Sequence, residues 1–416
     1  MSLVDPVLIV GAGMAGLTCA ARLHRCGVPF VLFDSADRVG GRLKTDRTED
    51  GFLLDHGFQV LLSAYPEVKR ELDLAALCGR AFCSGAVIRT QQQHSIHLRD
   101  PLRDPLAILS TLRAPIGSLF DKIQIARLIW DVLVSSPESL LAEDSGGTLE
   151  FLKERGISPR CLEVFFKPFF GGVFLDRSLS VDRRFFKFVF QQFVFGRVLL
   201  PEGGMQRVPE QIASRLPRES VRLSSTVVRA DKNAVELADG KRLRGKAVVL
   251  AVEGHAISKF VPQIETPADW KQTTCLYFGA SGNPGKGDGY LRLNALPNAL
   301  VHNVCFPSDI APEYAPSGQS LVSVSVHGKH GYSEDDLLNR VKKELVEWFG
   351  NEARDWKHLR TYKIPFALPS GLIRPASLRV IDGVYVCGDH LAYPSLNASM
   401  ATGRIVAEDL VRTCNK

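Results

Sequence analysis

The sequence predicts an α/β fold with an additional α+β domain, and three observations support this prediction. The first fifty residues contain two short apolar strands on either side of a glycine-rich turn and a helical pattern. Apolar strands and glycine-containing turns recur in two later blocks of the chain. The 416 residues, 45% of them apolar and 23% charged, suffice for two or three globular domains. We therefore expect a Rossmann-like domain assembled from discontinuous segments.

The N-terminal segment has the layout of a nucleotide-binding unit. Val7–Val10 is a short apolar strand, residues 14–25 show a helical pattern that ends at Gly27, and Phe30–Phe33 is a second strand. A turn of the pattern Gly-x-Gly-x-x-Gly, residues 11–16, joins the first strand to the helix. This order of elements is typical of dinucleotide-binding folds.

The residues of the turn have separate mechanical roles. Gly11 permits the tight turn, Gly13 lets the backbone approach a pyrophosphate, and Gly16 lets the helix pack close to the strand. The helix then begins at Met14 and Ala15, where free N–H groups and a partial positive charge favour phosphate binding. We therefore expect these five residues to form the pyrophosphate site.

An acidic residue completes the pattern after the second strand. Asp34, eighteen residues after Gly16, can accept hydrogen bonds from an adenosine ribose, and Ser35 beside it is a further candidate contact. A carboxylate at this place would repel a 2′-phosphate. This fingerprint alone does not separate NAD from FAD.

Motifs in the rest of the chain decide between the two cofactors. They are Arg-Val-Gly-Gly-Arg at 38–42, Leu-Asp-His-Gly-Phe-Gln at 54–59, Leu-Pro-Glu-Gly-Gly-Met at 200–205, and two C-terminal stretches at 384–390 and 395–404. Together these pieces resemble the flavin amine oxidase superfamily, which includes monoamine oxidases, protoporphyrinogen oxidases and phytoene-desaturase-type enzymes. The resemblance spans both ends and the middle of the chain, and it implies an FAD-dependent oxidoreductase.

The resemblance also implies FAD contacts from two N-terminal loops. These contacts come from Gly40, Gly41 and Arg42 along the pyrophosphate and ribityl chain, and from Gly57, Phe58 and Gln59 beside the flavin ring. The Arg42 guanidinium would supply positive charge to a phosphate.

Further contacts are implied in the later blocks. Val227 would contact the adenine through its backbone, and Gly388 and Asp389 would lie at the ribityl or pyrophosphate region. Ser399 and Met400 would open the last helix, with N–H groups directed at the pyrimidine edge of the flavin. A helix N-terminus there stabilises the negative charge of a reduced flavin.

Departures from the family pattern bear on the reaction. Monoamine oxidases carry a lysine near the flavin on a strand whose best equivalent, residues 274–278, contains none. They also place an aromatic-cage tyrosine where this chain has Ser395. Amine oxidation therefore loses support. No cysteine stands at the position of covalent flavin attachment in monoamine oxidases, so we expect noncovalent FAD. At the ribose position, Asp34 replaces the glutamate that is commoner in the family.

The positions of these motifs predict the domain organisation. Residues 1–85, 200–255 and 370–416 are expected to form the FAD-binding domain, and residues 86–199 and 256–369 the substrate domain. There is no second dinucleotide fingerprint, so electrons are expected to pass to oxygen, a quinone or another acceptor rather than to come from NAD(P)H.

An unusual concentration of phenylalanine lies in the expected substrate domain. Eleven of the 23 phenylalanines fall between residues 165 and 195, with Arg183, Arg184 and Lys187 interleaved. Three interpretations stay open: a hydrophobic core, an aromatic-lined pocket for a bulky apolar substrate, or a membrane-docking face with a basic rim.

Histidines supply the acid–base candidates. His56 and His390 lie inside flavin motifs and could exchange protons near pH 7, although each could equally fill its own loop. His-x-x-His pairs at 94–97 and 327–330 bring no clear third ligand, so we expect no metal. Lys363, a lone lysine before the last block, is interpreted as structural.

Composition limits the partners and the compartment. The net charge of +6 is spread without blocks, so nucleic-acid binding is not expected. Nine cysteines without a Cys-x-x-Cys pair fit a reducing, cytoplasmic compartment. No apolar stretch is long enough to span a bilayer, although peripheral contact with one membrane face stays open.

The functional hypothesis is hydride transfer from a C–H bond of a bulky apolar substrate to flavin N5, as in a desaturase or dehydrogenase. One alternative is a flavin amine oxidase. Another is a flavoprotein whose FAD is structural or serves redox-neutral isomerisation. Hydride transfer needs orientation and exclusion of water rather than a protein nucleophile.

Overall fold

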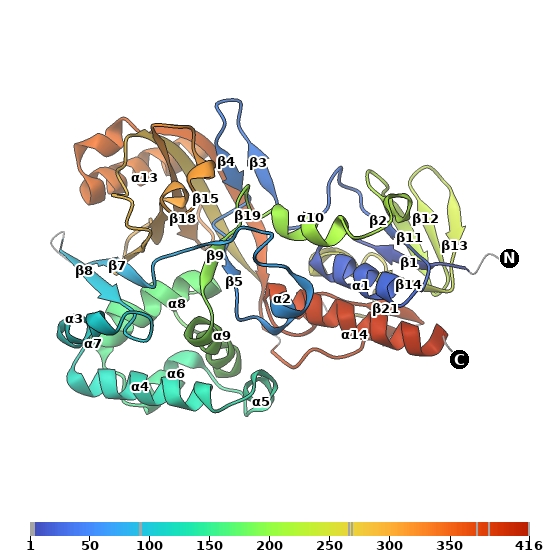
Figure 1. The fold of residues 1–416 in the computed structure, drawn as a ribbon, viewed down its shortest axis with the longest axis horizontal. Helices are drawn as coiled ribbons and strands as arrows, with labels where there is room; N and C mark the ends of the chain where they lie inside the picture. The colour runs from blue at the N-terminus through green and yellow to red at the C-terminus, as the bar shows by residue number, and fades with distance from the viewer. Residues whose placement is uncertain are drawn as a thin grey trace.

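A computed structural model describes residues 5–90, 94–264, 267, 269–371, 373–381 and 383–414. It contains a mostly parallel sheet with its helices near both termini, a long mixed sheet, and a bundle of helices below that second sheet (Figure 1). The predicted mixed α/β class, with a parallel sheet, is confirmed.

A six-stranded sheet forms the centre of the region near the two termini. Its order is β10-β2-β1-β14-β21-β20, and all neighbours are parallel except β21 and β20. The strands are β1 (Val7–Val10), β2 (Phe30–Phe33), β10 (Val221–Arg222), β14 (Ala247–Leu250), β20 (Val380–Ile381) and β21 (Val384–Val386). Both N-terminal strands have the predicted bounds, because each is a short apolar run buried on both faces.

Two helices cover one face of this sheet. Helix α1 (Met14–Arg25) packs along α14 (Leu396–Cys414), although the two are separated by most of the sequence (Figure 1). The contact depends on glycine, because a Cβ on Gly403 would lie 2.1 Å from the carbonyl oxygen of Ala15. The strands and helices of this region thus come from three separated parts of the chain, whereas the exact domain boundaries stay a prediction.

A small antiparallel meander covers the opposite face. It consists of β11 (Val227–Asp231), β12 (Ala234–Leu237) and β13 (Arg242–Arg244). Val227, Val235 and Leu237 pack against Leu8 and Val248 of the sheet. This core lies between the two layers.

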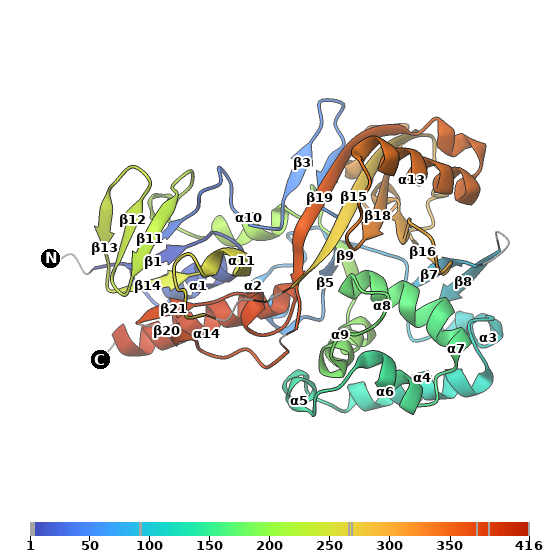
Figure 2. The same cartoon turned by 180° about the vertical axis from the view of Figure 1, so that it is seen from behind.

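The second large sheet has seven strands in the order β19-β15-β18-β17-β16-β7-β8. They are β7 (Gly85–Arg89), β8 (Ser95–Arg99), β15 (Trp270–Ser281), β16 (Leu291–Asn294), β17 (Asn303–Cys305), β18 (Gln319–His327) and β19 (Lys357–Pro369). Helix α13 (Glu334–Phe349) packs on one face, as Figure 2 shows from behind. The alternating side chains of β15 and β18 therefore divide between this core and the opposite face.

Short helices form the lower part of the molecule. They are α3 (Ile108–Arg113), α4 (Leu119–Leu133), α5 (Pro137–Ala142), α6 (Thr148–Glu154), α7 (Pro159–Cys161), α8 (Lys167–Phe174) and α9 (Arg183–Phe195). Within the described parts of the chain, no helix is long and apolar enough to cross a bilayer.

The remaining elements connect these parts. The strands are β3 (Thr45–Arg47), β4 (Leu53–Asp55), β5 (Leu61–Leu62), β6 (Arg80–Ala81) and β9 (Val198–Leu200), and the helices are α2 (Pro66–Glu71), α10 (Arg207–Ala213), α11 (Gly254–Ile257) and α12 (Pro307–Ile310). The buried carboxylate of Asp55 accepts hydrogen bonds from Thr45, Tyr314 and the Met205 N–H. One side chain therefore joins three distant segments.

Candidate functional site

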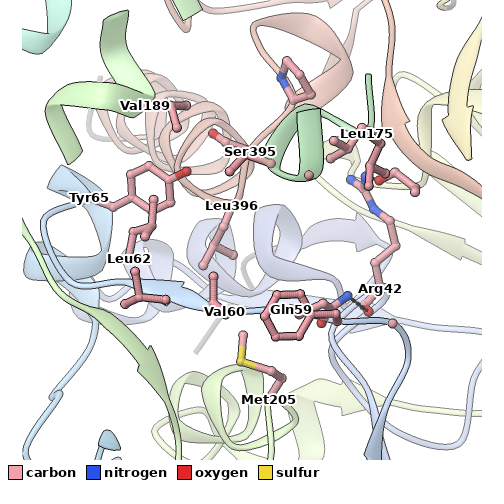
Figure 3. Close-up of a pocket in the computed structure, with 18 of the residues that line it drawn as sticks. Arg42, Gln59, Val60, Leu62, Tyr65, Leu175, Val189, Met205, Ser395 and Leu396 are labelled. Atoms are coloured by element: carbon pink, nitrogen blue, oxygen red, sulfur yellow. Dashed lines mark hydrogen bonds between the residues drawn. The ribbon is translucent and has the colours of Figure 1, made fainter. Parts of the chain in front are cut away.

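A single cavity of about 1360 Å³ runs from the carboxyl ends of β1 and β2 to the helices below the seven-stranded sheet. Most of the residues expected to bind the cofactor line it: Gly11, Gly13, Met14, Ala15, Asp34, Ser35, Gly40, Gly41, Arg42, Gly57, Phe58, Gln59, Val227, Gly388, Asp389 and Ser399. Figure 3 shows a close-up of the lining, with Arg42 beside Gln59 on one side of Val60, and Leu62 on the other.

Two glycine turns meet at the start of α1. The Gly40 N–H donates to the Ala12 carbonyl at 2.9 Å, and Gly13 and Gly40 form an isolated β-bridge. A Cβ on Gly13 would meet only the Cα of Gly41, at 3.9 Å. No side chain caps α1, whose first turn carries no acid. This bare, uncapped helix N-terminus fits a dinucleotide pyrophosphate.

Asp34 holds the glycine turn in place. One carboxylate oxygen accepts the Ala12 N–H at 2.7 Å, and the other accepts the Ala36 N–H at 2.8 Å. Each oxygen keeps a second acceptor position, which suits a ribose hydroxyl. The shorter acid thus reaches the turn itself, which the sequence pattern did not indicate.

Arg42 and Asp389 contact each other across 347 positions of sequence. The Arg42 guanidinium donates to Asp389 Oδ1 at 2.7 Å and to the Ala367 carbonyl at 3.0 Å. The sequence-based roles treated the two residues separately. Their ion pair means that the positive charge of Arg42 is balanced by Asp389.

The loop of residues 57–59 lines the cavity and packs closely against β19. Gly57 has a φ of +97°, and a Cβ there would lie 2.6 Å from Ile364 Cδ1. Gln59 donates to the Arg42 carbonyl at 3.0 Å, while its buried Oε1 has no partner among the described residues. A buried acceptor without a donor fits a cofactor that supplies one.

The last helix begins earlier than expected. It starts at Leu396 rather than at Ser399 and Met400, because Ser395 Oγ accepts the Ala398 N–H at 3.0 Å and caps it. Ser399 still lines the cavity, whereas Met400 is fully buried behind the lining. The expectation that residues 399 and 400 open this helix is therefore wrong by one turn.

The second half of the cavity is apolar. Six members of the phenylalanine cluster line it, namely Phe165, Phe169, Phe170, Phe185, Phe190 and Phe193. Four others are buried in the core, namely Phe166, Phe174, Phe186 and Phe188. Only Phe195 of the cluster is exposed, and Arg184 and Lys187 are paired with Asp182 and Glu143. The cluster is thus partly core and partly cavity wall.

Comparisons with known proteins agree with this geometry. The sequence profile of the flavin containing amine oxidoreductase family matches residues 14–411. The chain belongs to that family. It is an FAD-dependent oxidoreductase, as the motif resemblance predicted.

Individual relatives are distant from this family member. A 15-cis-phytoene desaturase of an Oncidium hybrid is 21% identical over 494 aligned residues, which cover 99% of this chain and 78% of the desaturase. Protoporphyrinogen oxidase 2 of Arabidopsis thaliana is 23% identical over 55% of this chain and 51% of its own length. The structure of a putrescine oxidase superimposes with a TM-score of 0.72 at 16% identity, covering 99% of both chains. That likeness shows the shared fold.

Three of the predicted site residues do not line the cavity of this flavin amine oxidoreductase. Gly16 lies behind it, where a Cβ would come within 1.9 Å of the Gly11 carbonyl oxygen. Met400 is the second. His390 is buried, and neither ring nitrogen has a partner among the described residues. Burial lowers the pKa of His390 to about 4, so its ring is neutral at pH 7.

His56 does line the cavity, but its ring is already engaged. Its Nε2 lies 3.0 Å from Asp46 Oδ2, and its ring packs on Tyr362 at a centroid distance of 4.6 Å. Burial lowers the pKa of His56, and Asp46 opposes that effect. The geometry indicates a loop-holding role for this side chain.

The sequence motifs missed a group of polar cavity residues. They lie on strands of the seven-stranded sheet: Thr273, Asn303, Ser325 and His327. Lys363 on β19, which was interpreted as structural from the sequence, also lines the cavity. His327 had been considered only for its spacing to His330, which instead contacts Thr274 at 3.0 Å. Tyr65 was missed as well; it lies beside Ser395 and Val189 in Figure 3. Strand alternation was the only available signal, and it does not show which face meets a cavity.

Proposed function

We propose that this oxidoreductase dehydrogenates a bulky apolar substrate held below the seven-stranded sheet. The observation that carries the proposal is the continuity between the dinucleotide half of the cavity and its apolar half. When bound, FAD supplies a hydride acceptor at flavin N5. A substrate C–H bond presented from the apolar half would meet that acceptor.

The chain's own residues would orient the substrate and exclude water. Val60, Leu62 and Leu396 place aliphatic groups between the predicted flavin loop and the start of α14, as Figure 3 shows. Phe169 and Phe193 extend this surface with rings 5.1 Å apart. Apolar walls favour a substrate that gains by leaving water.

The cavity lining does not favour a charged amine. Ser395 stands where an aromatic ring would help to orient an amine, as the sequence already indicated. Three of the four acidic residues that line the described cavity already have partners: Asp34 accepts backbone N–H groups, Asp100 pairs with Arg103, and Asp389 pairs with Arg42. The fourth is Glu253, whose Oε2 lies 3.3 Å from His255 Nδ1, so the lining leaves one carboxylate for an ammonium group.

The experiment is anaerobic reduction of the bound flavin, followed by its visible absorbance. We expect bleaching by a polyene isoprenoid or a reduced tetrapyrrole and none by putrescine. Bleaching by putrescine with peroxide formation in air would support the amine oxidase instead. If no compound bleaches the flavin but the pre-reduced protein isomerises a polyene, the dehydrogenase proposal is wrong and the redox-neutral alternative holds.

We also propose that the substrate enters from a membrane surface, at a place different from the phenylalanine cluster. Large apolar side chains are exposed on and beside α3 and α4: Leu102, Leu106, Ile108, Leu109, Leu112, Leu119, Phe120, Ile123, Trp130, Leu133 and Val134. Leu106 is 92% exposed and Trp130 66%. Ile108 and Leu112 also line the cavity, so this apolar patch is continuous with it.

Basic residues near the patch indicate an anionic bilayer as its partner. Arg113 ends α3, and Lys122 lies on α4. Vesicles containing phosphatidylglycerol should co-sediment with the wild type, and the L109D/W130D double variant should lose that binding. Val228→Asp, at an apolar residue of the meander that is 53% exposed, is the control. Equal binding by the wild type and L109D/W130D would refute this route.

A further inference from the structure

A polar strip crosses the otherwise apolar wall of the cavity. In the register of the seven-stranded sheet, Thr273 on β15 pairs with His327 on β18, and Asn303 on β17 pairs with Ser325. All four residues line the cavity. They therefore share one face of the sheet, opposite the face that packs on α13.

Two members of the strip have hydrogen-bonding atoms that the folded chain leaves unused. Asn303 is 4% exposed, and its Oδ1 has no partner among the described residues. The Nδ1 atom of His327 is also buried without a described partner. Such atoms cost free energy unless another group pairs with them. Both side chains line the same cavity, and a Cβ on Gly172 would lie 3.5 Å from Asn303 Nδ2 and 3.8 Å from His327 Cε1, so the two flank one point of its wall.

The surroundings make this site neutral. The ring of His327 stacks on His302 with centroids 4.5 Å apart, and the His327 backbone N–H donates to His302 Nδ1 at 3.2 Å. Burial, with the nearby charge of Arg177, lowers the pKa of His302 to about 4 and that of His327 well below its ordinary value. Both rings are thus uncharged at neutral pH, and the Arg177 charge disfavours a cationic ligand.

The strip is separate from the predicted flavin contacts. Strand β15 reaches the flavin loop through Tyr277, whose hydroxyl lies 3.4 Å from the Gly57 carbonyl oxygen. Strands β18 and β17 lie beyond β15 in the sheet order, on the side away from β19. Opposite them is α8, where a Cβ on Gly172 would lie 3.5 Å from Asn303 Nδ2. A ligand group here would belong to the substrate.

We propose that Asn303 and His327 form a subsite for a hydroxyl group carried by the apolar substrate. A hydroxyl group is neutral, and it can donate to one unused acceptor while accepting from a neighbour. The inference deepens the proposed dehydrogenase function by specifying a hydroxylated apolar molecule as the substrate class, and it rests on that function.

The test compares two probes that differ in this group. Farnesol and farnesene are fifteen-carbon isoprenoids with and without a hydroxyl group. Their binding to the FAD-loaded protein is measured by equilibrium dialysis from a cyclodextrin carrier, with gas chromatography. We expect farnesol to bind at least tenfold more tightly than farnesene to the wild type.

Variants of the two subsite residues show whether they cause the preference for farnesol. Asn303→Leu and His327→Leu should each reduce the farnesol-to-farnesene ratio at least threefold while preserving farnesene binding. His330→Leu is the matched control, because this histidine lies outside the cavity lining and contacts Thr274. Retained FAD absorbance shows that each variant is folded, and two variants on different strands guard against one that does not fold.

Three results would overturn the inference: a wild-type ratio near one, a ratio that both variants leave unchanged, or no binding of either probe. Flavin reduction is a separate measurement from dialysis. If an apolar substrate reduces the flavin but the protein does not discriminate between the two probes, the proposed function stands and the hydroxyl subsite is refuted.

Discussion

Replacing Asp34 tests the nucleotide site most directly. The Asp34 carboxylate accepts backbone N–H groups of Ala12 and Ala36 and is placed to accept ribose hydroxyls as well. In Asp34→Asn, one oxygen becomes an NH₂ group of nearly the same size. That group must then face one of the two backbone donors, so the variant changes hydrogen bonding and charge with little change in volume.

The expected magnitude follows from those contacts. A buried donor left without its acceptor costs about 1–3 kcal/mol, and a hydrogen bond to a charged group contributes about 1.5–3 kcal/mol against about 1 for a neutral one. The lost backbone contact weakens the apoprotein and the holoprotein alike, whereas exchanging a charged for a neutral acceptor weakens the ribose contact by about 1–2 kcal/mol, which corresponds to a roughly 5- to 30-fold weaker FAD affinity.

The assay is titration of apoprotein with FAD, followed by flavin fluorescence. Asp37→Asn is the matched control, because Asp37 is exposed, lies three residues away and loses the same charge. We expect its FAD dissociation constant to stay within twofold of the wild type. If Asp34→Asn also stays within threefold, the assignment of Asp34 to the nucleotide site is wrong.

Two further variants examine the loop of residues 57–59 and the buried carboxyl group of Asp55. Gly57→Ala should destabilise the holoprotein by about 2–4 kcal/mol, because residue 57 has a φ of +97° and a Cβ there overlaps Ile364. In thermal unfolding, adding Ile364→Val should recover only the part of this loss that comes from the overlap. Full recovery would show that the positive φ does not contribute. Burial raises the pKa of Asp55 to about 6, so the folded state holds a proton that the unfolded state releases near pH 4. Its contribution to the free energy of unfolding therefore falls by about 3 kcal/mol between pH 4 and 6. Asp55→Asn should remove that fall in urea unfolding, and parallel pH profiles for the two proteins would contradict the assignment.

Local patterns predicted the N-terminal unit well. Strands Val7–Val10 and Phe30–Phe33 and helix Met14–Arg25 have the predicted bounds. Apolar runs, the glycine turn and the helix end at Gly27 all act over a few residues. The end of a helix that depends on a side-chain contact was predicted less well, as at Ser395.

The phenylalanine cluster shows where sequence patterns stop being informative. Phe169 and Phe170 are neighbours that both line the cavity, whereas Phe186 and Phe188 are buried in the core beside Phe185 and Phe190, which line it. The residue type is the same throughout. Packing of α8 and α9 against other helices decides which rings meet the cavity, and no local pattern contains that information.

The sequence by itself determined the strand–turn–helix–strand unit, the family and the cofactor, because short-range patterns and motifs carry them. The tertiary structure alone decided that Arg42 pairs with Asp389, and that Asn303 and His327 face one cavity. Such contacts depend on strand register and on packing between segments hundreds of residues apart. The residues near each position do not specify the strand register or this packing, so these contacts are known only from the folded chain.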